Sequence, residues 1–127
     1  MALTRISIRK GKSAEYKQAI LNSLYSAMSE VFDIADDNDF MVIHEHEHDG
    51  FVYGKSYLNI ERTDDLVIIQ ITANDTRTTE QKQALYSRIA ELLQLEPGIR
   101  PEDVFISLIE IKKENWSLGS GLAQYID

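Results

Sequence analysis

The chain has 127 residues, a formal net charge of −8 and no cysteine. Its length fits one domain that buries a core without disulfides, and the lack of cysteine excludes a thiolate metal site and a cysteine nucleophile. An acidic chain is poorly suited to nucleic acid, because phosphate binding needs clustered lysine and arginine. The apolar runs are too short to span a bilayer, and the first residues, MALTRISIRKGK, lack a signal peptide's apolar core, so we expect a soluble cytoplasmic protein.

The first half of the chain predicts a strand, a helix and a second strand. Residues 4–8, TRISI, alternate apolar and polar side chains, as a strand with one buried side does. Ser13 is suited to cap a helix, and apolar residues recur at three- and four-residue spacing over residues 14–32. After the acidic loop DIADDND, residues 40–48, FMVIHEHEH, are expected to form the second strand.

The second half repeats this plan roughly 64 residues further along the chain. Residues 66–73, LVIIQITA, and 104–111, VFISLIEI, predict strands, and Thr78 and Gln81 have the capping-box spacing for a helix at 79–95. Two βαβ units of similar length are indicated. We therefore predict one α/β domain over residues 1–127, made of pseudo-repeats 1–48 and 66–111, a connector 49–65 with a short strand at 56–60, and a C-terminal tail 112–127.

The strands of the second half are apolar on both sides. Leu66 and Ile68 point one way and Val67, Ile69 and Ile71 the other, and residues 104–111 show the same pattern. Right-handed crossovers allow both helices to cover one face of a four-stranded sheet. Strands that are apolar on both sides are normally buried on both sides. We expect other copies of the chain to cover the second face, which makes the protein an obligate oligomer.

Four stretches of sequence form a specific set: Arg62-Thr63-Asp64-Asp65 before the central strand, Glu80-Gln81-Lys82 at the start of the second helix, His44-Glu45-His46, and the tail WSLGSGLAQY from Trp116 to Tyr125. Together they resemble the tautomerase superfamily of oxalocrotonate tautomerase and macrophage migration inhibitory factor, and within it the malonate semialdehyde decarboxylase branch. The resemblance spans nearly the whole chain. It implies a homotrimer with active sites between subunits, which agrees with the oligomer expected from the strands.

The resemblance also implies chemistry at an amino-terminal proline, whose amine transfers a proton as general acid or base. Burial in an apolar pocket lowers the pKa of such an amine, because it disfavours the cation. Ala2 stands at the position of this proline. Once Met1 is removed, Ala2 offers a primary amine that can still take a proton or form an imine, but it lacks the geometry of the proline ring.

Two further positions of the family's site are altered. The resemblance implies two arginines after the central strand that bind a carboxylate and polarise a carbonyl; Arg77 matches one, and Asn74 or Asp75 stands at the other. The acidic residue that helps to activate water in the decarboxylase corresponds to Asn38, or to Asp37 beside it. Arg77 can equally be a solvated loop residue, and the acidic loop a solvated turn.

The tail carries the only tryptophan of the chain and two glycines. The resemblance implies that Trp116, Leu118 and Tyr125 form the apolar wall of the pocket over the amino terminus, while Gly119 and Gly121 allow tight turns. The alternative for these three apolar side chains is packing between subunits, and both can hold together.

Three alternating histidines, His44, His46 and His48, are expected on one face of a strand. At strand spacing one zinc ion takes two of them at most, so a polar strand face near an interface is favoured over a metal site. We expect no metal and no cofactor.

Two functions from different classes follow. The first is a tautomerase-superfamily enzyme that performs enol–keto tautomerisation, hydration or decarboxylation of a small oxo acid, with altered or impaired activity because the proline is absent. The second is a non-catalytic trimer that binds a small anion or serves in interactions. Neither involves nucleic acid or a membrane.

Overall fold

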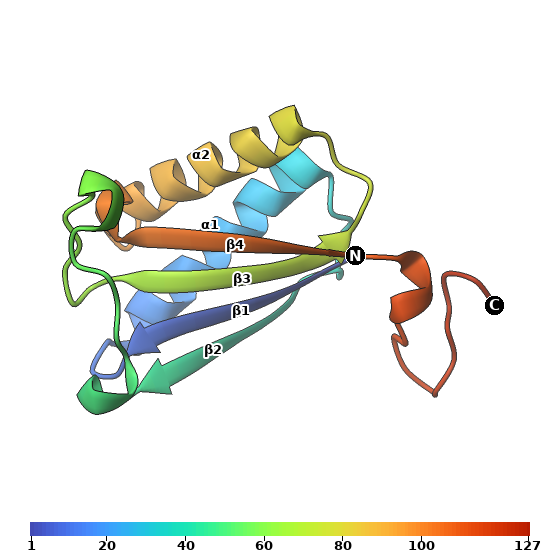
Figure 1. Ribbon diagram of the computed structural model, residues 1–127. Helices are drawn as coiled ribbons and strands as arrows, with labels where there is room; N and C mark the ends of the chain where they lie inside the picture. Colours follow the sequence, from blue (N-terminus) through green and yellow to red (C-terminus); the bar gives the residue numbers. More distant parts are fainter.

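Four strands and two long helices alternate along the chain in a computed structural model that describes residues 1–127 (Figure 1). The strands pair in the order β2-β1-β3-β4. β1 is parallel to β2, β3 is parallel to β4, and β1 and β3 are antiparallel. The two predicted βαβ units are therefore confirmed. The elements are β1 (Ala2–Arg9), α1 (Ala14–Phe32), β2 (Phe40–His46), β3 (Val67–Asn74), α2 (Thr79–Leu95) and β4 (Val104–Ile111).

Both helices begin at the predicted caps. The Ser13 hydroxyl accepts a hydrogen bond from the Tyr16 N–H at 3.1 Å, which satisfies an otherwise free donor of α1. At α2, the Thr78 hydroxyl accepts from the Gln81 N–H at 3.1 Å, and the Gln81 side chain accepts from the Thr78 N–H at 2.9 Å. These bonds fix the first residue of each helix and the direction in which each chain segment leaves its strand.

The core lies between the sheet and the two helices, which cover the same face (Figure 1). Neither helix combines the length and apolar composition that a membrane span requires. In α2, Leu85 and Ile89 are fully buried, whereas Ala84 is exposed. The fully buried side chains that meet there include Ile6, Ile69, Ile71, Ile20, Leu24, Leu85, Ile89 and Leu93.

The other face of the sheet is uncovered in the single chain. Phe40 and Val42 of β2 are 51% and 43% exposed, and Phe105 and Ile109 of β4 are 48% and 42% exposed. Phe40 and Ile109 lie in register across the sheet, because Leu3 pairs with both Phe40 and Thr72, and Thr72 with Ile109. Large apolar side chains on a continuous face indicate a surface that another protein chain covers.

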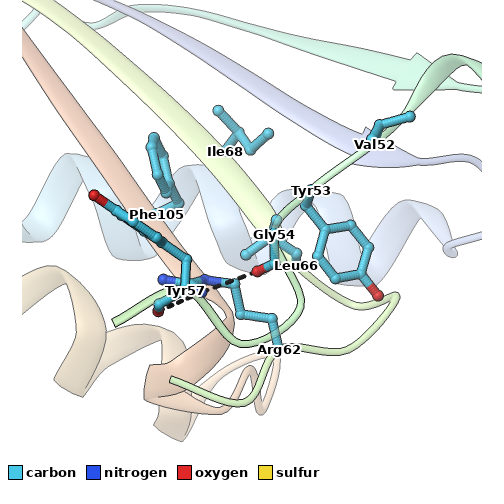
Figure 2. A pocket seen from close by; sticks show the side chains of 8 residues that line it. All are labelled: Val52, Tyr53, Gly54, Tyr57, Arg62, Leu66, Ile68 and Phe105. Carbon is cyan, nitrogen blue, oxygen red and sulfur yellow. Dashed lines mark hydrogen bonds between the residues drawn. The ribbon is translucent and has the colours of Figure 1, made fainter. Parts of the chain in front are cut away.

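The connector between β2 and β3 contains no strand, so the predicted strand at 56–60 is wrong. Tyr57–Asn59 forms a 3-10 turn in which Leu58 has a φ of 59°. Arg62 Nη1 donates to the carbonyl oxygens of Gly54 and Tyr57, each at 3.0 Å, as Figure 2 shows. Carbonyls that converge on one guanidinium cannot pair with a sheet edge. The turn instead forms one wall of a mainly apolar pocket of about 350 Å³ over Phe105.

Candidate active site

Three chain segments meet at one end of the sheet. Because β1 runs antiparallel to β3, and β3 parallel to β4, the start of β1 lies beside the ends of the other two strands. Ala2 pairs with Ala73, and Asn74 pairs with Ile111. Figure 1 shows the amino terminus at this end, where the C-terminal tail leaves β4. Ligand sites commonly lie at the carboxyl ends of parallel strands, and in this protein the terminal amine lies at the same end of the sheet.

A pocket of about 220 Å³ opens beside the amino terminus. Its lining is mostly apolar, and Ser117 is its one hydroxyl-bearing residue: Met1, Leu3, Phe40, Trp116, Ser117 and Leu118. The structure therefore places two of the three tail residues that we expected, Trp116 and Leu118, against the first residue of the chain. Tyr125, the third, is half-buried but does not line this pocket.

A single hydrogen bond fastens the tail to the sheet. Trp116 Nε1 donates to Asn74 Oδ1 at 2.7 Å, and Asn74 is only 7% exposed. Asn74 is one of two residues, with Asp75, that can correspond to the arginine that the resemblance implies, and its side-chain oxygen accepts a hydrogen bond from the indole. A buried pair of this kind holds the tryptophan ring in one orientation.

Beyond Trp116 the tail folds back on itself. Leu118 N–H donates to Gln124 Oε1 at 2.8 Å, and Gln124 Nε2 donates to the Gly119 carbonyl at 2.6 Å. Gly119 and Gly121 have φ values of 147° and 71°, which a side chain would disfavour, as expected from the sequence. The tail projects beyond the end of the sheet (Figure 1), with Leu122 and Ile126 exposed.

Arg77 lies between β3 and α2, half-buried and held by the end of α1. Its Nη2 donates to the Phe32 carbonyl at 2.9 Å, and its guanidinium stacks 4.6 Å from the centre of the Phe32 ring. Burial lowers the pKa of Arg77, and Tyr125 and Asp33 act in the opposite direction. Arg77 remains a cation, since the guanidinium does not lose its proton in proteins. It is a positioned cation rather than a freely solvated one.

The terminal amine has an altered acidity. Partial burial lowers the pKa of the Met1 amine, and the positive charges of Arg77 and Lys113 lower it further. The sequence analysis did not identify Lys113 as a candidate site residue. Its position just before Trp116, where the tail motif begins, could have indicated this role. The structure thus brings together an amine whose neutral form is favoured and two cations.

Ala2 and Asn38 take different places. Ala2 begins β1 with its side chain on the helix-covered face and 1% exposed. Asn38 lies in the loop before β2, where its N–H donates to the Ala35 carbonyl at 3.2 Å. Its side chain makes no hydrogen bond and does not line the pocket, so a single chain does not bring it to the amine.

The three histidines do not share one strand face, and that expectation is wrong for His48. β2 ends at His46, and His48 lies in a 3-10 turn. Its Nδ1 accepts a hydrogen bond from Arg9 Nη1 at 2.9 Å. No group of three or more His, Cys, Asp or Glu side chains is placed to hold a metal ion.

Known proteins resemble this chain both in sequence and in fold. Two family models, both described as tautomerase enzyme, match residues 38–119 and 3–59. The probable tautomerase YusQ of Bacillus subtilis (strain 168) is 41% identical over 127 residues and covers 100% of both chains. The chain also resembles the crystal structure of FG41 malonate semialdehyde decarboxylase inhibited by 3-bromopropiolate, with 31% identity, a TM-score of 0.90 and coverage of 98% and 94%. A fused 4-OT wild-type symmetric trimer shares the fold, with 19% identity, a TM-score of 0.79 and coverage of 94% of each chain.

Proposed function

The chain belongs to the tautomerase superfamily, and from this premise we propose that it is an enzyme that moves a proton on a small oxo acid, with its terminal amine as the acid–base group. The observation that carries the proposal is that Met1 lines an apolar pocket and that burial, together with the charge of Arg77, lowers the pKa of its amine. The reactions that this arrangement suits are enol–keto tautomerisation, hydration and decarboxylation of a 2- or 3-oxo acid.

The proposed steps use few groups. Arg77 binds the substrate carboxylate, because its guanidinium is already oriented by Phe32 and carries further N–H donors. The neutral amine accepts the proton of the enol hydroxyl as the carbonyl forms, and the resulting ammonium gives a proton to the adjacent carbon. Trp116 and Leu118 exclude water from one side, which strengthens these charge interactions. A pocket of about 220 Å³ suits a small substrate.

The identity of the amine depends on the first residue. With Met1 retained, its amine lies at the pocket that it lines. With Met1 removed, the amine belongs to Ala2. Ala2 is the first residue of β1, is buried and pairs with Ala73. The intact mass of the purified chain distinguishes the two forms, and it is the first measurement that the proposal needs.

We also propose that the protein is a homotrimer. The uncovered sheet face is apolar, and the 4-OT structure that shares this fold is a symmetric trimer. Three copies related by a closed rotation cover that face without leaving an open edge. The projecting tail then lies beside a neighbouring copy.

The test of function is the ketonisation of phenylenolpyruvate by the wild type, Arg77→Ala and Ala2→Pro. We expect the wild type to be active, and kcat/KM of Arg77→Ala to fall by at least roughly tenfold, because a carboxylate partner is lost. The rate is expected to rise with pH through the lowered pKa of the amine, since only the neutral amine accepts a proton. An inactive wild type that binds phenylpyruvate without turnover would contradict the enzyme proposal.

The alternative is a non-catalytic protein that binds a small anion, and one observation favours it. Ala2 stands where the resemblance implies a proline, and Asn38, in the place of an acid, cannot act as a base. If activity emerges only in Ala2→Pro, the site is intact but the natural chain is a binding protein. Turnover by the unmodified chain excludes this alternative.

A further inference from the structure

The end of the sheet that carries the amine has a second cation close to it. Lys113 begins a 3-10 turn, Lys113–Asn115, directly after β4. This turn follows Ile111, which pairs with Asn74, and the preceding residue, Ala73, pairs with Ala2, so the turn begins at the end of the sheet where the chain starts (Figure 1). The resemblance implies two arginines after the central strand, and this chain retains only Arg77 there.

Hydrogen bonds fix the turn on both sides of Lys113. Before it, the Asp75 N–H donates to the Ile111 carbonyl at 3.2 Å and extends the β3–β4 ladder. After it, the Trp116 N–H donates to the Lys113 carbonyl at 3.4 Å, while the indole is bound to Asn74 at 2.7 Å. Trp116 shares the pocket with Met1. The backbone of Lys113 is therefore tied to the pocket wall.

The Lys113 ammonium has no partner of its own. Four other lysines form salt bridges, namely Lys10, Lys12, Lys17 and Lys82. Lys113 is exposed and takes part in none. Its charge nevertheless reaches the amine, whose pKa it lowers together with burial and Arg77. In a chain of net charge −8, Arg77 and Lys113 are two cations whose charges both act on the amine of Met1, a residue that lines the pocket, and such a local excess of positive charge favours an anion.

We propose that Lys113 is a second substrate-binding residue, which holds the carboxylate of the oxo acid together with Arg77 at the pocket beside the amino terminus. The inference rests on the proposed function for its substrate class. A cation from the segment after β4 thereby compensates for the arginine that is missing after β3. The positive charge of Lys113 also favours the neutral form of the amine, as burial and Arg77 do to a greater extent.

The test compares Lys113→Met and Lys113→Arg with Lys112→Met. Lys112 is the matched control, because it is adjacent, exposed and unpaired, and it does not affect the amine. Three quantities are measured: the Kd of phenylpyruvate by calorimetry, the KM for phenylenolpyruvate, and the amine pKa from the pH dependence of its acetylation, read by mass spectrometry. Circular dichroism checks that each variant is folded.

For Lys113→Met we expect Kd and KM to rise by roughly threefold to tenfold, because one charge-assisted contact at an exposed site is lost. The pKa of the amine rises, because removing a neighbouring positive charge favours the ammonium. Lys113→Arg and Lys112→Met stay close to the wild type. An unchanged Kd in Lys113→Met, with a weakened one in Arg77→Ala, overturns the inference and leaves the proposed function standing.

The two proposals fail separately. If the wild type does not turn over phenylenolpyruvate, the proposed function fails, while the Kd of phenylpyruvate and the amine pKa still decide the role of Lys113. If the wild type does not bind phenylpyruvate at all, the inference about Lys113 is overturned as well.

Discussion

Each residue of the stretch Arg62-Thr63-Asp64-Asp65 has a structural partner. The Thr63 N–H and hydroxyl donate to the carboxylate of Asp103 at 2.7 and 2.6 Å, and Asp103 is 1% exposed. Asp64 pairs with Arg9 at 3.0 Å and accepts from the Tyr53 hydroxyl at 2.7 Å. These contacts lie where β3 and β4 begin, at the opposite end of the sheet from the amine. The stretch therefore fixes the connector and does not touch the candidate active site.

The bond between Thr63 and Asp103 gives a stability prediction. Thr63→Val keeps the shape of the side chain but removes one of two short hydrogen bonds to a buried carboxylate. We expect the free energy of unfolding to fall by about 1.5–3 kcal/mol, the usual contribution of a hydrogen bond to a charged group. Urea unfolding followed by circular dichroism measures it. Asp65→Asn, which breaks an exposed ion pair with Lys12, is the control and should change stability by under about 1 kcal/mol.

Among the secondary-structure elements, α2 bears most directly on function. Its capping box begins at Thr78, the residue after Arg77, so the start of the helix and the position of the guanidinium depend on the same turn. α1 has a comparable cap at Ser13, but it follows the far end of β1 and lies away from the amine. The two helices are therefore capped by the same kind of side-chain hydrogen bond, at opposite ends of the sheet.

Removing each cap separates stability from binding. Thr78→Ala and Ser13→Ala should each lower the free energy of unfolding by about 1 kcal/mol, because a helix N–H loses its acceptor. Only Thr78→Ala should also raise the KM for phenylenolpyruvate, since Arg77 is displaced. Denaturant unfolding and steady-state kinetics on both variants measure this. Equal KM values in the two variants would show that the α2 cap does not position Arg77.

For the whole molecule, the uncovered sheet face decides the state of assembly. Its exposed apolar side chains lie on both outer strands, while Arg5, Gln70 and Ser107 form a polar row across the sheet. The mainly apolar pocket under the connector adjoins the same face at Phe105 (Figure 2). A face with this mixture suits close packing against identical copies with polar contacts between them.

The proposed trimer is tested by placing a charge on that face. Phe105→Glu should give a monomer in light scattering after size-exclusion chromatography, because burying an unpaired carboxylate between subunits is strongly unfavourable. Leu95→Glu is the matched control: Leu95 is 73% exposed at the end of α2 on the other side of the molecule. It should leave the mass of the assembly unchanged. A wild type that is monomeric at all concentrations would refute the trimer.

Local patterns in the chain were sufficient to predict the elements and their caps. Alternation and helical spacing located both βαβ units, and the polar residues Ser13 and Thr78 marked the helix starts, because capping depends on neighbours within three residues. The strands that are apolar on both sides also predict, from the sequence alone, a second sheet face that another chain must cover. The resemblance of the tail to a tautomerase motif also came from the sequence, and the family is now established by comparison.

What could not be predicted depends on contacts between distant residues. The connector lacks a strand because Arg62 draws several carbonyls together, and His48 leaves its strand to meet Arg9. Lys113 gained significance only when the ends of β3 and β4 were seen beside the amine. Periodicity records which side chains are buried along one element, whereas the field at a site sums charges from segments that only the folded chain brings together.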